Sequence, residues 1–266
     1  MNLQAPIRLL RATACVALAG WLLHAAPAPS VERIIAQSIE ATQSDWNAAP
    51  NFDYQERDTD PSTGDSKTYH VQMILGSPYN RLVAVNGKPL SLDKQQQEEK
   101  KLQEETRKRR NESLQEHSKR VADYEKSRKR DHALILEMPK ALKFSLRGSD
   151  QLDGHAVYVI NATPREGYSP PNSHAKVLTG MEGTLWIDQE TYQWMKVEAH
   201  VVHTVSIAGF LADVQPGTFF LLEKRPVTGG VWQPSHFEMK AEVKILDLIP
   251  HDSATSETYF DYKKVR

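Results

Sequence analysis

Residues 183–201 alternate apolar and polar side chains on both sides of an acidic turn at residues 189–191. Successive side chains of a strand point to opposite faces of a sheet, so this alternation predicts a half-buried antiparallel hairpin. In the first strand, Leu185 and Ile187 point one way and Trp186 and Asp188 the other. In the second strand we expect one face to carry Met195, Val197, Ala199 and Val201, and the other to carry Trp194, Lys196, Glu198 and His200.

The same period of two recurs along most of the chain. It is clearest near the C-terminus, where Phe237 and Met239 should face inward and Glu238 and Lys240 outward. We expect about nine to eleven strands in one antiparallel meander. Because only one face is apolar, the predicted fold class is mainly β (α+β), a curved antiparallel sheet or incomplete β-barrel with an apolar concave face.

Two segments are candidates to cover that concave face. Residues 31–46 have helical apolar spacing and follow Ser30, which can cap a helix. Residues 206–214 are small and apolar, and we expect either a short helix or a wide connection there.

Residues 91–138 form a charged helical insertion between the predicted strands. Its central part, residues 94–131, contains 13 basic and 9 acidic residues and neither glycine nor proline. This composition favours a long, mostly solvated helix or helical hairpin that projects from the sheet and ends before Pro139. A solvated arm is one interpretation, and contact with a protein partner or membrane surface is the other. The basic candidates for such contact are Arg107, Lys108, Arg109, Arg110, Arg128, Lys129 and Arg130.

The N-terminus has the pattern of an export signal. Arg8 and Arg11 precede an apolar stretch at residues 12–23, and small residues follow up to Ala28. We therefore predict a signal peptide over residues 1–28, a single domain over residues 29–266, and a periplasmic location, with possible association with the outer membrane. An uncleaved N-terminal anchor is the alternative. The one cysteine, Cys15, lies within the signal, so the mature chain has no cysteine nucleophile and no cysteine metal ligand.

The chain contains no sequence motif of a known catalytic, phosphate-binding or metal-binding site. We expect no enzyme activity, no cofactor and no metal site. The formal net charge of -1 gives no general attraction to nucleic acid, and we expect no nucleic-acid partner.

Large apolar side chains on the predicted inward faces indicate a possible ligand groove. A curved sheet with a loose helical cover can enclose a cavity suited to acyl chains, whereas an ordinary filled core is the alternative. The candidate groove residues are Tyr69, Val71, Met73, Trp186, Trp194, Phe219, Phe220, Trp232, Phe237 and Met239.

Four short motifs resemble a known family. They are V-N-G-K-P-L-S at residues 85–91, G-x-L-W-I-D at 183–188, Y-x-W-x-K-V at 192–197 and V-W-x-P at 231–234. Together they resemble the outer-membrane lipoprotein-sorting (LolA-like) superfamily, in a divergent bacterial group, over residues 31–266. The charged insertion is much longer than the helical cover of the well-studied carriers.

The resemblance implies an incomplete antiparallel barrel closed by helices around an apolar cavity, with no catalytic residues. It further implies a periplasmic carrier whose partner is a lipid or an acylated protein of the lipoprotein type. The superfamily also includes envelope-stress sensors that bind regulatory proteins. An envelope protein-interaction module, whose basic helical arm binds a partner or a membrane surface, is therefore the alternative function.

Overall fold

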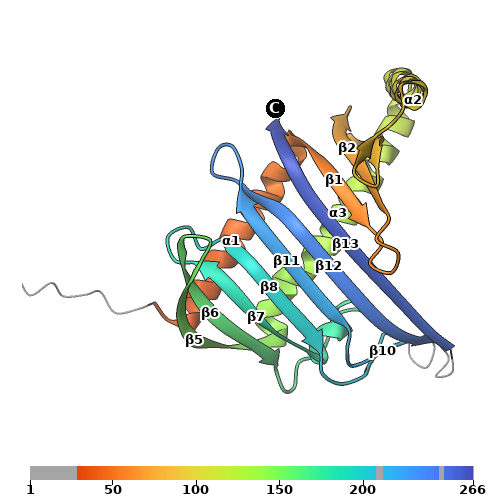
Figure 1. The fold of residues 1–266 in the computed structure, drawn as a ribbon. Helices are drawn as coiled ribbons and strands as arrows, with labels where there is room; N and C mark the ends of the chain where they lie inside the picture. The colour runs from red at the N-terminus through yellow and green to blue at the C-terminus, as the bar shows by residue number, and fades with distance from the viewer. Residues whose placement is uncertain (1–28, 208–211, 246–248, 266) are drawn as a thin grey trace, which may run out of the picture.

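The computed structural model describes residues 29–207, 212–245 and 249–265, so the predicted signal peptide lies outside the described residues. One antiparallel sheet of 13 strands dominates it (Figure 1). The sheet is curved and does not close, which confirms the predicted fold class. The strands are β1 (Phe52–Thr59), β2 (Ser66–Ile74), β3 (Ser77–Val85), β4 (Lys88–Pro89), β5 (Leu142–Leu152), β6 (His155–Pro164), β7 (Met181–Asp188), β8 (Trp194–Val201), β9 (Val205–Ser206), β10 (Ala212–Val214), β11 (Phe219–Pro226), β12 (Trp232–Ile245) and β13 (Ile249–Lys264).

The sheet is not the simple meander that we predicted, and it has more strands than the predicted nine to eleven. Its order is β4-β3-β2-β1-β13-β12-β11-β8-β7-β6-β5, with β9 and β10 attached beside β12. The first strand therefore pairs with the last, from Phe52 opposite Lys264 to Thr59 opposite Ser256. This pairing joins two meanders at the middle of the sheet and places the start of β1 beside the end of β13.

Helix α1 (Val31–Ala48) forms where the sequence predicts it. The Ser30 side chain accepts a hydrogen bond from the Arg33 amide and so caps the first turn. Ile34 and Ile35 pack into the main core, against buried residues of β5, β6, β7 and β8. A helix whose apolar stripe meets the apolar face of a sheet is the expected arrangement for a two-layer domain.

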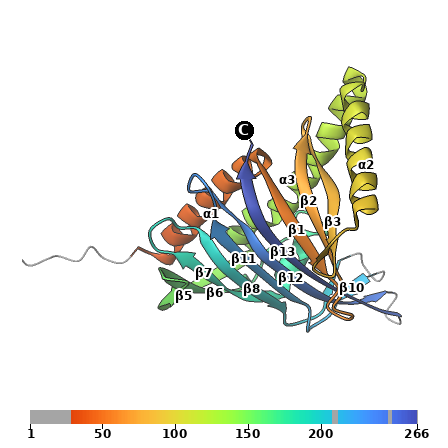
Figure 2. The same cartoon turned by 45° about the horizontal axis from the view of Figure 1, so that its top comes forward.

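The charged insertion folds as a helical hairpin, α2 (Leu92–Arg110) followed by α3 (Leu114–Ala141). Figure 2 shows α2 standing beside the β2–β3 end of the sheet and α3 running back across the sheet. The prediction of a projecting, solvated arm is wrong for α3. Val121 lies against Gly76 of the β2–β3 turn and Arg128 donates to the Trp46 carbonyl oxygen, while Ile135 and Met138 further along pack against the main core. The helix also continues through Pro139, because a proline in the last turn removes only one intrahelical hydrogen bond.

Two further expectations are corrected by the strand pairing. A β-bulge shifts the β7–β8 register, so that Trp186 lies opposite Lys196 and Ile187 opposite Trp194. The extra residue turns Trp194 into the main core with Ile187, while Met195 packs in a second cluster with Trp186. The segment 206–214 does not form the expected helix or open connection in its described part. It contributes to β9 and β10, which extend the sheet, so the cover consists of α1 and α3.

Among the described residues, no helix combines the length and the apolar character needed to cross a membrane.

Candidate functional site

A cavity of about 570 Å³ lies between the concave face of the sheet and the two covering helices. Its walls come from β1, β2, β3, β11, β12 and β13 on one side and from α1 and α3 on the other. The lining residues are Trp46, Ala49, Phe52, Tyr54, Val71, Met73, Pro78, Tyr124, Arg128, His132, Ile135, Phe220, Leu222, Gln233, Pro234, Phe237, Glu257, Tyr259 and Tyr262.

The apolar wall follows from strand alternation and register. Leu222 lies directly opposite Phe237, and the Phe220 ring meets the Phe237 ring edge-on at 5.3 Å between centroids. Val71 and Met73, two residues apart on β2, belong to the same wall. Side chains spaced by two along neighbouring strands share one face, which gives the cavity a continuous hydrocarbon and aromatic surface.

Three tyrosines form a second wall where β1 meets β13. The Tyr54 ring stacks on Tyr262 at 5.1 Å between centroids and lies 6.0 Å from Tyr259, tilted by 59°. Burial is the largest cause of a raised pKa for each of these phenols. The three hydroxyls therefore remain neutral at physiological pH and offer polar contacts without charge.

The helical side is fixed by contacts around Trp46. The Arg128 guanidinium lies 4.3 Å from the Trp46 ring centroid and donates to the Trp46 carbonyl oxygen. The His132 ring stacks on Trp46 at 4.7 Å and contacts Gln43 Oε1 at 2.8 Å through Nε2. Burial, followed by the Arg128 charge, lowers the pKa of His132, so this imidazole is neutral at pH 7. These contacts join α3 to the last turns of α1.

Acidic residues occupy one end of the concave face. Carboxylate oxygens of Glu56, Asp58 and Glu257 lie within 4.8 Å of one another, and Tyr259 donates a hydrogen bond to Glu257. Burial, followed by the Asp58 charge, raises the pKa of Glu56 to about 7. Within the described ranges this is the one group of three such side chains close enough to share a cation. Clustered oxygen ligands suit a hard cation or an ammonium group.

The structure brings four of the ten predicted groove residues together at the cavity, namely Val71, Met73, Phe220 and Phe237. Trp194 lies instead in the main core, and Trp186 and Trp232 lie in the second cluster. The other three predicted residues that do not line the cavity are Tyr69, Phe219 and Met239.

Several aromatic residues of the cavity were not predicted from the sequence, namely Trp46, Tyr54, Tyr124, Tyr259 and Tyr262. Tyr54, Glu56 and Asp58 alternate along β1, and this pattern could have placed them on one face. The proximity of Tyr54 to Tyr259 depends on the pairing of β1 with β13, which no local signal announces.

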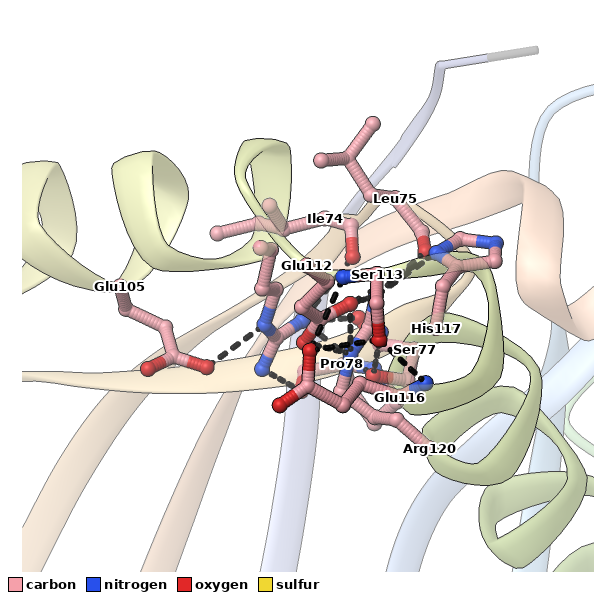
Figure 3. A network of polar contacts seen from close by, with 11 residues as sticks. Ile74, Leu75, Ser77, Pro78, Glu105, Glu112, Ser113, Glu116, His117 and Arg120 are labelled. Atoms are coloured by element: carbon pink, nitrogen blue, oxygen red, sulfur yellow. Dashed lines mark hydrogen bonds and ion pairs between the residues drawn. The ribbon is translucent and has the colours of Figure 1, made fainter.

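The predicted basic residues divide into inward and outward groups. Arg109 is buried, and its Nη1 donates to the carbonyl oxygens of Ile74 at 2.9 Å and Ser77 at 2.8 Å. Figure 3 shows the neighbouring contacts, in which Arg120 donates to Ser77 Oγ at 2.7 Å and pairs with Glu112 at 2.8 Å. The guanidinium groups of Arg109 and Arg120 hold the hairpin on the sheet, and Arg128 joins α3 to α1.

The outward group comprises Arg107, Lys108 and Arg110, with Lys129 and Arg130 further along α3. All five residues are exposed. Arg107, Lys108 and Arg110 form no ion pair with any residue that the structure describes. The exposed cations of α2 lie beside the tip of the hairpin, where Leu114 is 87% exposed.

One histidine–carboxylate pair has the geometry of a catalytic dyad. His155 Nδ1 lies 2.9 Å from Asp188 Oδ2. The other Asp188 oxygen accepts from the amides of Glu190 and Thr191 and from the Thr191 hydroxyl, so Asp188 closes the β7–β8 turn. In the described chain no serine or threonine hydroxyl contacts His155, and the pair is explained by its role in the turn.

No protein-family model matches the chain, and no curated protein sequence matches it either. Among solved structures it is similar to a LolA superfamily protein from Nitrosomonas europaea, at 13% identity and a TM-score of 0.32, over 90% of this chain and 94% of that one. A candidate outer membrane lipoprotein-sorting protein domain from Vibrio parahaemolyticus matches at 10% identity and a TM-score of 0.32, over 86% and 92%.

The MucA/MucB complex of Pseudomonas aeruginosa matches at 10% identity and a TM-score of 0.23, over 86% of this chain and 92% of that one. The similarity is distant, so the fold class rests on the sheet topology itself.

Proposed function

We propose that this protein binds a lipid or an acylated ligand without catalysing a reaction, by burying a hydrocarbon chain in the cavity between the sheet and α3. The observation that carries the proposal is the cavity of about 570 Å³ with its largely apolar and aromatic walls. Cavities of this size are typical of small-molecule sites. Each buried methylene contributes about 0.8 kcal/mol to binding.

The composition of the walls favours a chain over a compact polar ligand. Aliphatic side chains from β2, β11 and α3 provide surface with no hydrogen-bonding demand, for example Val71, Leu222 and Ile135. The polar groups are confined to the tyrosines, the acidic end and the Arg128 side. An amphiphile fits this arrangement, because its apolar chain can contact the apolar wall while its polar head group contacts the polar side chains.

We further propose that the protein acts in the periplasm as a carrier, with lipoprotein-type acyl chains as one cargo class. The export pattern of residues 1–28 supports the location, and the apolar cavity supports the cargo.

Native mass spectrometry of the protein purified from its periplasm, followed by extraction of bound molecules, tests the proposal. We expect co-purified lipid or acylated peptide in near-stoichiometric amount, together with binding of an uncharged fluorescent acyl probe. An empty protein that also fails to bind the uncharged acyl probe would overturn it.

Two alanine-to-tryptophan substitutions, one in the cavity wall and one on the surface, test where the acyl chain binds. Ala49→Trp adds volume to the cavity wall and should abolish binding of the acyl probe. Ala122→Trp makes the same change at an exposed position of α3 and should leave binding intact. Equal binding by both variants would show that the probe binds elsewhere.

The second candidate function is contact of the hairpin with an acidic protein partner or a membrane surface. It is favoured by the exposed, unpaired cations Arg107, Lys108 and Arg110 on a hairpin that Arg109 and Arg120 hold in place. Replacing the three exposed cations with Glu should abolish such association and retain acyl binding. Arg109 is kept, because its loss would loosen the hairpin itself. Unchanged association after the triple reversal would remove this function.

A further inference from the structure

Hydrocarbon binding does not account for the acidic cluster beside the cavity, in which Glu257 lines the cavity and Glu56 and Asp58 lie next to it. Asp58 lies directly opposite Glu257 across the β1–β13 pair, and Glu56 lies opposite Tyr259. All three carboxylates therefore share the face that carries the tyrosines. Burying clustered acids beside an apolar cavity is unfavourable unless a cation or a proton compensates their charge.

No cation of the described chain provides that compensation. Lys67 lies opposite Asp58 in the β1–β2 register, but its side chain is exposed and forms no ion pair with the acids. The Asp58 Oδ1 atom is itself buried and accepts no hydrogen bond from the described residues unless Glu56 carries a proton. The raised pKa of Glu56, at about 7, indicates that a shared proton partly fills this role near neutral pH.

Aromatic rings adjoin the acids on the cavity side. Tyr54, Tyr259 and Tyr262 all line the cavity together with Glu257, and Phe237 lies opposite Glu257 in the β12–β13 register. Aromatic rings grouped around carboxylates are a known arrangement for quaternary ammonium groups, since ring faces and anions both attract a large, weakly hydrated cation.

We propose that the cavity selects amphiphiles with an ammonium head group, which binds among Tyr54, Tyr259, Tyr262 and the carboxylates of Glu56 and Glu257 while the chain extends along the apolar wall. The inference rests on the proposed function, because the chain is bound in the same cavity. An ammonium group would neutralise the acids without requiring a proton. A carboxylate head group would add a further negative charge to the cluster.

Displacement of an uncharged fluorescent acyl probe tests the selectivity. The competitors are three single-chain amphiphiles of equal chain length, with trimethylammonium, hydroxyl or carboxylate head groups, used below their micelle concentrations. We expect the ammonium amphiphile to displace the probe at a concentration about tenfold lower than the alcohol, with the carboxylate weakest.

Substitutions of single carboxylates show whether the ammonium preference comes from the acidic cluster or from the overall charge of the protein. Glu257→Gln and Glu56→Gln should each reduce the ammonium preference. Glu238→Gln makes the same charge change next to Phe237 on the other face of β12 and should leave the preference unchanged. Neither Glu257→Gln nor Glu56→Gln should unfold the protein, because each removes repulsion between like charges.

The possible failures are distinguishable. If no amphiphile displaces the probe and the probe itself does not bind, the proposed function fails. If all three amphiphiles compete equally, or Glu238→Gln has the same effect as Glu257→Gln, hydrocarbon binding stands and the head-group selectivity is overturned. Preferential binding of calcium ions alone at the acidic end, with no ammonium preference, would also overturn it.

Discussion

The Lys224 ammonium lies 2.6 Å from an oxygen of Asp45, and each side chain is only 7% exposed. The other Asp45 oxygen accepts a hydrogen bond from the Trp232 amide at 3.0 Å. Asp45 is in the last turns of α1, whereas Lys224 and Trp232 belong to β11 and β12. This buried pair therefore fixes the end of α1, next to Trp46, against the sheet and positions one wall of the cavity.

Removing one partner of the pair should be costly. Asp45→Asn leaves Lys224 buried without a counter-charge, and we expect a loss of about 3 to 5 kcal/mol in the free energy of unfolding. Asp123→Asn, which breaks the exposed Lys119–Asp123 pair, should change the free energy of unfolding far less, because solvent screens this pair. Chemical denaturation measures both. Similar small losses in the two variants would show that the buried pair does not anchor the helix.

The anchoring of the hairpin depends on the guanidinium of Arg109. Lysine cannot reach Ile74, Ser77 and Pro78 at once, so Arg109→Lys should leave buried carbonyl groups without donors. We expect local destabilisation of about 1 to 3 kcal/mol, seen as faster hydrogen exchange in α2 and the hairpin tip. Arg110→Lys is the control and should not change exchange. If hydrogen exchange in α2 and the hairpin tip were as slow in Arg109→Lys as in Arg110→Lys, the anchoring role of Arg109 would be contradicted.

The β2–β3 turn requires glycine where α3 passes over it. Gly76 has φ +94°, and a Cβ there would lie 2.9 Å from Val121 Cγ2. We expect Gly76→Ala to destabilise the protein by about 1 to 3 kcal/mol. Gly64→Ala, also at positive φ but in open space, should cost less. Adding Val121→Ala should recover part of the Gly76→Ala loss. No recovery would mean that backbone strain alone is responsible.

The acidic cluster should make stability depend on pH. The pKa of Glu56 rises from 4.5 in the unfolded chain to about 7 in the folded protein, so the folded state binds more protons between these values. This stabilising contribution is complete below pH 4.5 and is lost as the pH rises through about 7. Thermal unfolding should therefore show that Glu56→Gln raises Tm above pH 7 relative to the native chain, with little effect below pH 5. A constant difference across this range would contradict the shift.

The strands were predictable because alternation is a local property. The hairpin at residues 183–201 and the inward row of β12 follow from side chains that point alternately to two faces. The β-bulge of β8 was not predictable, because one extra residue reverses the faces of the strand without changing its composition. This is why Trp194 and Met195 exchange the faces predicted for them.

The cavity was only partly predictable. Val71 and Phe237 were found because their strands are strongly periodic. Trp46 and His132 lie on different helices and meet only in the tertiary structure. The sequence also could not predict which basic side chains are buried. Arg109 and Arg110 are adjacent in sequence, and only their different positions around the helix make one buried and the other exposed.

Fluorescence quenching by a brominated acyl chain shows where in the protein the chain binds. Trp46 lines the cavity, whereas Trp186 lies in the second cluster and Trp194 in the main core. We expect quenching that is largely lost in Trp46→Phe and retained in Trp186→Phe, while mass spectrometry shows that both variants still bind the chain. Quenching that is unchanged in Trp46→Phe, or absent although the chain binds, would contradict the location of the acyl chain in this cavity.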